Sequence, residues 1–461
     1  MKIVSFNAEK VNGYLDFNID FNETLTFLIG INGSGKTTAI KLILGLLSPS
    51  WINLTQIKYD FAEITCILDK ELITIRSEHI DSDKIKLSIK YETDKIRSTT
   101  STVKVQDLSI IQPSNVSRFE VRQIVTRYTR YETHFVELDV VKKIREIATP
   151  IFLGLDRRIH QGSEIDLLSM DSFMRERDYT NDIKGNLYES LIEIENLIKK
   201  SFLEYSQIQS EIGSSLKNKI INSSFEIIQN SESTAVSTKT DTNILDRKYK
   251  IIEASKSFEI PDLENKIITY FDKLHKIQKD LADESKKSQK SGKKSEAFMN
   301  KLGQWFINIP QLQRIDSIIS IYEDAQNEIV SHYRKFIAFE ALANKYFEEN
   351  NKKLSIKKNG EIEIQLPDGR QNSIFKLSSG EKQVIVMLAQ LIFGEKRKIF
   401  IIDEPELSLH LGWQEIFVQT IQEASPDTQF ILATHSPSII GSIENEKYCV
   451  DLTKETGYAQ V

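Results

Sequence analysis

The sequence predicts an α/β protein in which a mixed β-sheet core is interrupted by a long helical insertion. Strand-like apolar or alternating runs fill residues 1–30, 57–108 and 149–158, and they return after residue 350. Between them, from Leu187 to about Phe347, apolar residues recur at steps of three and four, which is typical of amphipathic helices. We therefore expect three parts in the 461 residues: 1–158, an inserted helical arm at 159–352, and 353–461.

The first part begins with predicted strands. KIVSF and YLDFNIDF alternate apolar and polar residues, and LTFLIG is the short apolar run of a strand that enters a sheet interior. A glycine-rich turn follows, and TTAIKLILGLL has the apolar content of a buried helix. YDFAEITCIL, ELITIRS and KIKLSIKYE are again strand-like, and TPIFLGLDRR at 149–158 is expected to be a buried strand that runs into a charged edge.

The arm is predicted to consist of three helical stretches, at about 187–212, 263–281 and 298–347. Residues 221–249 are rich in Ser, Thr and Asn, which indicates a loop or mobile turn. The lysine-rich tract KKSQKSGKK at 286–294 is expected to be a solvated, mobile tip. At this length the arm is far too short for a long coiled coil.

Strand signals return in the third part. KLSIKKNGEIEIQLPDG predicts a hairpin that turns at Asn359-Gly360, with a second turn at Pro367-Asp368-Gly369. The last hundred residues then alternate helix and buried strand, in VIVMLAQLIF, KIFIID and QFILATH.

Composition is that of a soluble globular protein, with 40% hydrophobic and 27% charged residues. The net charge of −6 does not indicate a nucleic-acid binder, so any basic surface would have to be local. The N-terminus lacks the plan of a signal peptide, and no apolar run approaches the roughly 18 residues of a membrane helix. Cys66 and Cys449 match no metal spacing, which favours reduced thiols in a cytoplasmic protein without a membrane partner.

One motif indicates a nucleotide phosphate site. Gly30-Ile-Asn-Gly-Ser-Gly-Lys-Thr37 fits G-x-x-x-x-G-K-[ST] between a predicted strand and a predicted helix. Its backbone N–H groups and the helix N-terminus favour phosphate. We expect ATP to be bound by the following residues: Gly30, Asn32, Gly33, Ser34, Gly35, Lys36, Thr37 and Thr38. Lys36 would neutralise the β- and γ-phosphates, and Thr37 would bind Mg²⁺.

Two further strand ends carry polar side chains. The buried run before Asp403-Glu404 places Asp403 at a strand tip, where it is expected to hold Mg²⁺, and Glu404 is expected to orient and deprotonate the attacking water. The run QFILATHS ends in His435, which is either structural or a contact to the γ-phosphate. Alone, a carboxylate pair at a strand end is usually a solvated edge; the phosphate motif favours the functional interpretation.

The segment Leu377-Ser-Ser-Gly-Glu-Lys-Gln383 precedes a predicted helix. Ser378 is expected to be its N-cap, and Glu381 three residues later completes a capping box. The small residues, including Gly380, also leave this helix N-terminus open to a phosphate.

These four elements resemble, in order and spacing, the Walker A, signature, Walker B and switch-histidine motifs of ABC-type ATPases. The resemblance covers roughly residues 1–60, 150–160 and 353–440, and it implies an ABC-type ATPase head with an inserted helical arm. LSSGE and DEPELSLH (403–410) are similar to the SMC-like branch, and within it to OLD-type and related prokaryotic defence ATPases. Asp156-Arg157-Arg158 resembles a segment of those proteins, and Gln161 and Gln112 are alternative candidates for the family's Q-loop.

The resemblance implies an ATP-sandwich homodimer or higher homo-oligomer in which Ser378 and Gly380 reach the γ-phosphate of the other copy. Leu407–His410 would follow the seam between the two copies. The chain continues only about 25 residues past His435, so we expect any nuclease to be a separate subunit. This arrangement resembles the ATPase subunits of two-component anti-phage systems, first the PARIS ATPase (AriA) family and then the Septu ATPase (PtuA) family.

Three functions remain open from the sequence. The first is the sensor ATPase of an anti-phage system, which controls a Toprim-type nuclease and responds to an acidic phage trigger protein through the lysine-rich tract. The second is a DNA-repair ATPase of the RecF or SMC kind that clamps DNA. The third, a transporter ATPase subunit, is disfavoured by the LSSGE form and by the large insertion.

Overall fold

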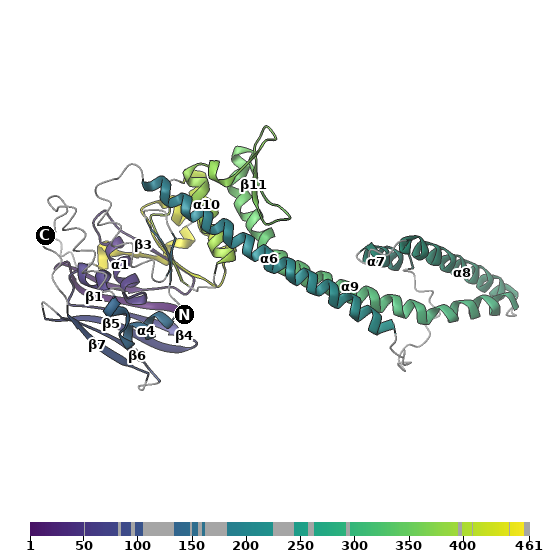
Figure 1. Cartoon of the computed structure of the whole chain (residues 1–461), viewed down its shortest axis with the longest axis horizontal. Coiled ribbons are helices and arrows are strands. Elements are labelled where there is room, and N and C mark those ends of the chain that lie inside the picture. The colour runs from purple at the N-terminus through teal and green to yellow at the C-terminus, as the bar shows by residue number, and fades with distance from the viewer. Residues whose placement is uncertain are drawn as a thin grey trace. The chain divides into compact units, whose positions relative to one another are not determined.

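The computed structural model describes most of the chain. The described residues are 1–49, 51–81, 84–93, 97–104, 133–147, 150–154, 159–161, 182–224, 244–256, 262–291, 296–394, 399–407, 409–441 and 443–455. They form two compact units, one of residues 1–200 with 335–461 and one of residues 201–334. Each unit is described by itself, with the elements labelled in Figure 1.

One sheet of the first unit is antiparallel throughout. Its order is β2-β1-β4-β5-β6-β7. The strands are β1 (Lys2–Val11), β2 (Leu15–Asp20), β4 (Phe61–Leu68), β5 (Glu71–Asp81), β6 (Lys84–Tyr91) and β7 (Thr99–Lys104). Buried residues alternate with more exposed ones along β2 and β4, so a single face of these strands packs into the core. The strands predicted from residue 1 to residue 104 are confirmed, and residues 105–108 of that prediction lie outside the described part of the chain.

The second sheet brings the expected site residues to one edge. Its order is β15-β3-β14-β13-β8-β9, and all neighbours are parallel except β8 and β9. The strands are β3 (Leu25–Ile29), β8 (Ile151–Leu153), β9 (Ile159–Gln161), β13 (Ile399–Asp403), β14 (Gln429–Ala433) and β15 (Cys449–Asp451). β13 and β14 are buried along their whole length, as expected for a sheet covered on both faces. Because β3, β13 and β14 are parallel, the segments that follow them meet at the same edge.

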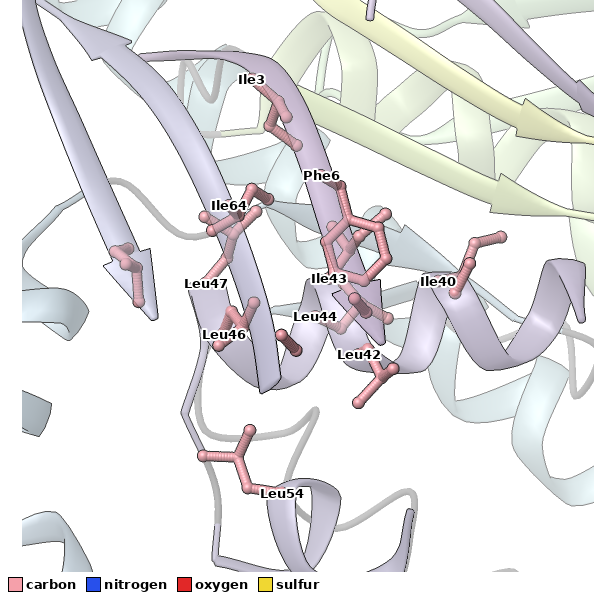
Figure 2. Close-up of a cluster of buried hydrophobic side chains, with 14 of the residues drawn as sticks. Ile3, Phe6, Ile40, Leu42, Ile43, Leu44, Leu46, Leu47, Leu54 and Ile64 are labelled. Atoms are coloured by element: carbon pink, nitrogen blue, oxygen red, sulfur yellow. The ribbon is translucent and has the colours of Figure 1, made fainter. Parts of the chain in front are cut away.

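Helix α1 (Lys36–Leu47) packs between the two sheets. Figure 2 shows its apolar side chains, among them Ile40, Ile43 and Leu44, against Ile3 and Phe6 of β1. The same buried cluster also contains Ile401 of β13 and Ile431 of β14. α1 is therefore buried on nearly every side, which fixes the loop before it relative to both sheets.

The first unit also contains further helices and a separate sheet of β10, β11 and β12. They are α2 (Trp51–Gln56), α4 (Asp139–Glu146), β10 (Lys353–Ile356), β11 (Ile362–Gln365), β12 (Gln371–Asn372), α10 (Ser379–Phe393), α11 (Leu411–Ala424), α12 (Pro437–Ile440) and α13 (Leu452–Glu455). The hairpin β10–β11 turns at Gly360, and the second turn has Gly369; both glycines have positive φ, at 79° and 81°. The predicted turns are confirmed.

Two long helices, α6 (Asp182–Ser224) and α9 (Glu296–Phe347), belong to both units, because each unit boundary falls inside them. The division from the sequence, by contrast, places the boundaries of the arm at 158/159 and 352/353. The second unit also contains α7 (Ile244–Lys256) and α8 (Leu263–Ser291). Its core joins Ile251 and Ala254 of α7 to Phe271 and Leu274 of α8 and to residues 312–319 of α9.

The sequence predicted a loop at 221–249, and both of its predicted boundaries are wrong. α6 continues through Ser224 and α7 begins at Ile244; the residues between them lie outside the described part of the chain. α7 forms despite its polar flank because Ile244, Ile251 and Ala254 share one buried face. In the lysine-rich tract, Lys286 and Lys287 are exposed residues of α8, whereas Lys293 and Lys294 lie outside the described residues.

None of the helices in the described residues combines the length and the apolar character that a membrane span requires.

Candidate active site

The loop after β3 has the conformation of a phosphate cradle. Gly30, Gly33 and Gly35 all have positive φ, at 146°, 88° and 90°. A Cβ atom on Gly35 would lie 2.8 Å from Cζ of Phe17 on β2, so the sequence needs glycine there for both backbone angle and space. Gly35 is also the N-cap of α1 and provides no side-chain cap, so the first N–H groups of the helix are left for another acceptor.

Lys36 is the first residue of α1, directly after this loop, and is only 6% exposed. Its ammonium donates to the backbone oxygen of Gly30 at 3.1 Å and lies 2.5 Å from Nε2 of His435. An ammonium can only donate, so a hydrogen bond between the two groups has Nε2 of His435 as its acceptor. Burial lowers the pKa of Lys36, and the carboxylates of Asp403, Glu404 and Glu406 oppose that shift.

Thr37 and Asp403, the two expected Mg²⁺ ligands, are in direct contact. The Thr37 hydroxyl donates to Oδ2 of Asp403 at 3.0 Å. Asp403 is 4% exposed, and its Oδ1 has no partner. Burial raises the pKa of Asp403 to about 6, Glu404 adds to the shift, and the Thr37 hydrogen bond and Lys36 oppose it. A buried carboxylate with a free oxygen beside a threonine hydroxyl is the oxygen donor set that Mg²⁺ prefers.

Glu404 follows Asp403 in a left-handed backbone conformation, with φ of 50°. Such a conformation is uncommon for a residue other than glycine, and strain of this kind is concentrated at functional sites. The turn is held because the Glu404 N–H donates to the Ala433 oxygen at 2.8 Å. The carboxylate of Glu404 acts electrostatically on both Lys36 and Asp403, which places it at the same edge of the sheet.

The predicted capping box of α10 is confirmed. The Ser378 hydroxyl accepts from the Glu381 N–H at 3.4 Å, and Glu381 Oε2 accepts from the Ser378 N–H at 2.8 Å. Ser378 is exposed, whereas Gly380 is buried. Within the described residues, no hydrogen bond or ion pair joins Ser378 or Gly380 to the phosphate-binding loop of residues 30–37, the P-loop.

The remaining predicted site residues are placed less directly. Asn32 and Gly33 are exposed and Thr38 is half-buried, with no side-chain contact that would assign a role. Ser34 is 3% exposed and its hydroxyl has no partner. Gln161 ends β9, but its side chain lies outside the described residues, as do Gln112 and residues 156–158.

Sequence reasoning missed two side chains that join distant segments, one at this edge and one at the opposite end of the parallel strands. The hydroxyl of Thr453 in α13 accepts from the Ile31 N–H at 3.3 Å, so the C-terminal segment contacts the P-loop. Gln429, at the start of β14, accepts from the Ile3 N–H at 2.7 Å and donates to the Ile3 oxygen at 2.8 Å, joining the second sheet to β1 of the first. These partners are 422 and 426 residues apart, and no local pattern indicates either contact.

This geometry fits magnesium and a nucleoside triphosphate. The uncapped N-terminus of α1 and the Lys36 ammonium are suited to phosphate, and the orphaned oxygens of Asp403 and Ser34 are suited to a cation and its water. The fold and site therefore define a P-loop nucleotide-binding protein.

The chain belongs to the AAA ATPase domain family (AAA_15), whose match covers residues 1–440. The predicted fold class, an α/β ABC-type ATPase head with an inserted helical arm, is confirmed by the two sheets around α1 and by the long helices α6 and α9.

Two curated relatives match short segments. "Retron Vc95 probable ATPase" of Vibrio cholerae serotype O1 biovar El Tor is 34% identical over 94 residues, 18% of this chain and 18% of that protein. "Retron Ec83 probable ATPase" of Escherichia coli is 28% identical over 86 residues, 16% of each. The chain thus spans less than a fifth of the length of these relatives.

Among solved structures, the chain is similar to SMC head domains. The Smc head domain with an extended coiled coil from Pyrococcus furiosus matches with 14% identity and a TM-score of 0.35, over 95% of this chain and 91% of that one. The SMC head domain from Thermotoga maritima matches with 12% identity and a TM-score of 0.33, over the same shares.

Proposed function

We infer that this chain is an ATP-binding and ATP-hydrolysing switch that acts between two copies of itself. The observation that carries the proposal is the contact of the Thr37 hydroxyl with Asp403 beside the buried Lys36 ammonium, at the uncapped start of α1. Packing of the core does not account for this set of groups, since it leaves the buried Oδ1 of Asp403 and the buried hydroxyl of Ser34 without a partner.

Each residue has a distinct task in this proposal. Lys36 binds the β- and γ-phosphates, and Thr37 and Asp403 hold Mg²⁺. Glu404 orients and deprotonates the attacking water, a task suited to a carboxylate fixed at the tip of a buried strand. His435 contacts the γ-phosphate from the end of β14. Bound MgATP supplies the transferable phosphoryl group and the counter-charge for Asp403.

Hydrolysis is tested with two variants that separate binding from chemistry. Lys36→Ala should lose ATP binding, because it removes the buried ammonium. Glu404→Gln should keep binding but lose about 10²-fold or more in the rate, because water is no longer oriented in the transition state. Lys41→Ala, an exposed change on the same helix, is the matched control and should hydrolyse ATP normally. Hydrolysis by Glu404→Gln at the wild-type rate would contradict the assignment.

The homodimer is proposed because Ser378 is exposed at the N-terminus of α10 and, among the residues that the structure describes, has no hydrogen bond to residues 30–37 of its own chain. A second copy then provides Ser378 and Gly380 to the γ-phosphate. Mixing Lys36→Ala protein with Ser378→Arg protein should restore part of the activity, because each mixed dimer contains one intact site. Absence of rescue in verified mixed dimers would show that each copy hydrolyses ATP alone.

The biological role that we propose is regulation within a prokaryotic defence system. The retron ATPases among the relatives favour this role, although they match less than a fifth of the chain. The sequence resemblance to PARIS-type ATPases adds a Toprim-type nuclease as the regulated partner and an acidic phage protein as the trigger. Co-purification with the product of the adjoining gene tests the partner. A duplex-DNA mobility shift with and without ATP tests the alternative, a DNA clamp.

A further inference from the structure

Glu406 lies three residues after Asp403 in sequence, yet it binds the segment that follows a different strand. Its Oε1 accepts from the backbone N–H of His435 at 2.9 Å, and its Oε2 accepts from the Thr434 hydroxyl at 2.8 Å. The hydroxyl oxygen of Thr434 in turn accepts from the Ser436 N–H at 3.0 Å. One carboxylate therefore fixes three consecutive residues directly after β14.

The fixed segment carries the imidazole that contacts the P-loop lysine. Nε2 of His435 lies 2.5 Å from the Lys36 ammonium, although the histidine residue as a whole is exposed. An exposed side chain is free to adopt other rotamers unless its backbone is held. The hydrogen bond from the His435 N–H to Glu406 supplies that restraint, and Thr434, which is fully buried, anchors it.

The same network returns to the segment that contains Glu406. The Ser436 hydroxyl lies 2.6 Å from Oε1 of Gln414, to which it donates, and Nε2 of Gln414 donates to the Leu409 oxygen at 2.8 Å. The Leu409 N–H donates to the backbone oxygen of Glu406 at 3.1 Å, which completes this hydrogen-bond network. Glu406 and Leu409 are thus both joined to residues 434–436, Glu406 directly and Leu409 through Gln414.

We propose that Glu406 is a positioning residue for hydrolysis: it holds residues 434–436 so that His435 stays on Lys36. This inference rests on the proposed function, because it gives Glu406 a role only if Lys36, Glu404 and His435 act on ATP. The hydrogen bond between Glu406 and His435 joins residues 29 apart in sequence, so the local DEPELSLH pattern does not indicate it.

The test is Glu406→Gln, which keeps the size of the side chain but replaces one of its two acceptors with a donor. Misplacement of a reacting or binding group by about 1 Å costs roughly 10²-fold in rate. We expect the hydrolysis rate at saturating ATP to fall about 10- to 100-fold, while the Kd for ATP changes less than about threefold because the P-loop is intact. Glu415→Gln makes the same chemical change on the exposed side of α11 and should hydrolyse at the wild-type rate.

A double-mutant cycle separates positioning from a general structural effect. If Glu406 acts through His435, adding Glu406→Gln to His435→Ala should lower the rate less than about threefold further. Radiolabelled ATP keeps the residual activity of His435→Ala measurable. An additional loss as large as in the wild-type background, or a wild-type rate for Glu406→Gln, would overturn the proposal.

A second pair of variants covers the case in which Glu406→Gln fails to fold. Thr434→Val removes only the hydroxyl that bridges Glu406 and Ser436, whereas Thr434→Ser keeps it. The valine variant should lose rate in the wild-type background but not in His435→Ala, and the serine variant should recover it. Equal rates for the two variants would overturn the proposal. Full activity of Lys36→Ala and Glu404→Gln would instead mark failure of the proposed function itself.

Discussion

Asp403→Asn should stabilise the nucleotide-free protein, although it removes a proposed Mg²⁺ ligand. The pKa of Asp403 is raised from 3.8 to about 6, mainly by burial. The folded state therefore penalises the carboxylate by about two pKa units, or about 3 kcal/mol once the pH is well above both values. The penalty is absent at low pH and grows as the pH rises through the interval between the two pKa values. An amide has no charge to desolvate.

The net gain is smaller than this penalty. The amide oxygen can still accept from Thr37, but the amide nitrogen would occupy the place of Oδ1, which has no partner. An unmatched buried donor costs at least about 1 kcal/mol. We expect Asp403→Asn to be more stable by about 2 kcal/mol at pH 8 and by less than about 1 kcal/mol at pH 5, where the wild-type carboxylate is partly protonated in the folded state.

Calorimetric unfolding in EDTA at the two pH values checks this expectation. A gain of about 2 kcal/mol corresponds to a rise of a few degrees in Tm. Asp427→Asn, an exposed change on the turn before β14, is the matched control and should have the wild-type Tm. A variant less stable than the wild type at pH 8, or a gain that is the same at pH 5, would refute the reasoning that burial of the charge destabilises this site.

Two further predictions concern stability. Gly35→Ala should cost about 2–4 kcal/mol, because it combines positive φ with a Cβ 2.8 Å from Phe17, whereas Gly33→Ala, with positive φ and open space, should cost only about 1 kcal/mol; equal losses of Tm would contradict the close approach. Lys352→Ala should cost about 2–3 kcal/mol, since it leaves the 2%-exposed carboxylate of Glu381 without its ion pair. Burial favours a raised pKa for Glu381, but hydrogen bonds from Lys352 and Ser378 outweigh it and lower the pKa. The stabilisation by the Lys352–Glu381 pair should therefore be lost as the pH falls below about 4.5, the ordinary pKa of the carboxyl group. A loss of stability in Lys352→Ala that is the same at pH 3.5 and pH 7 would argue against this pH dependence.

The features that sequence predicted well are those encoded over a few residues. The P-loop spacing, the capping box of Ser378 and Glu381, and the hairpin turn at Gly360 depend on neighbours within about eight positions, and all three have the expected local structure. The strands were predictable for the same reason, since alternation or continuous apolar character follows directly from how a strand is covered. The roles of the site residues in ATP hydrolysis remain predictions.

What sequence could not predict depends on contacts between distant segments. The position of Glu406 is the clearest example: as part of DEPELSLH it has no distinguishing pattern, and only the parallel pairing of β13 with β14 brings it to Thr434 and His435. α7 was missed for a different reason. Its buried residues, Ile244, Ile251 and Ala254, are few, and the serine- and threonine-rich stretch before it dominated the local composition.

Near the end of α9, the burial of the partners determines which of three ion pairs contributes most to stability. Three ion pairs join the end of α9, or the residues just after it, to later parts of the chain. They are Lys345 with Glu423, Glu349 with His410, and Lys352 with Glu381. The first two pairs are between 39% and 56% exposed, and such pairs contribute about 0–1 kcal/mol. Glu381 alone is buried, and its carboxylate accepts from the Lys352 ammonium and from the Ser378 N–H. The ion pair between Lys352, which follows α9, and Glu381 at the N-terminus of α10 is therefore the contact whose loss should affect the residues proposed to meet the γ-phosphate of a second copy.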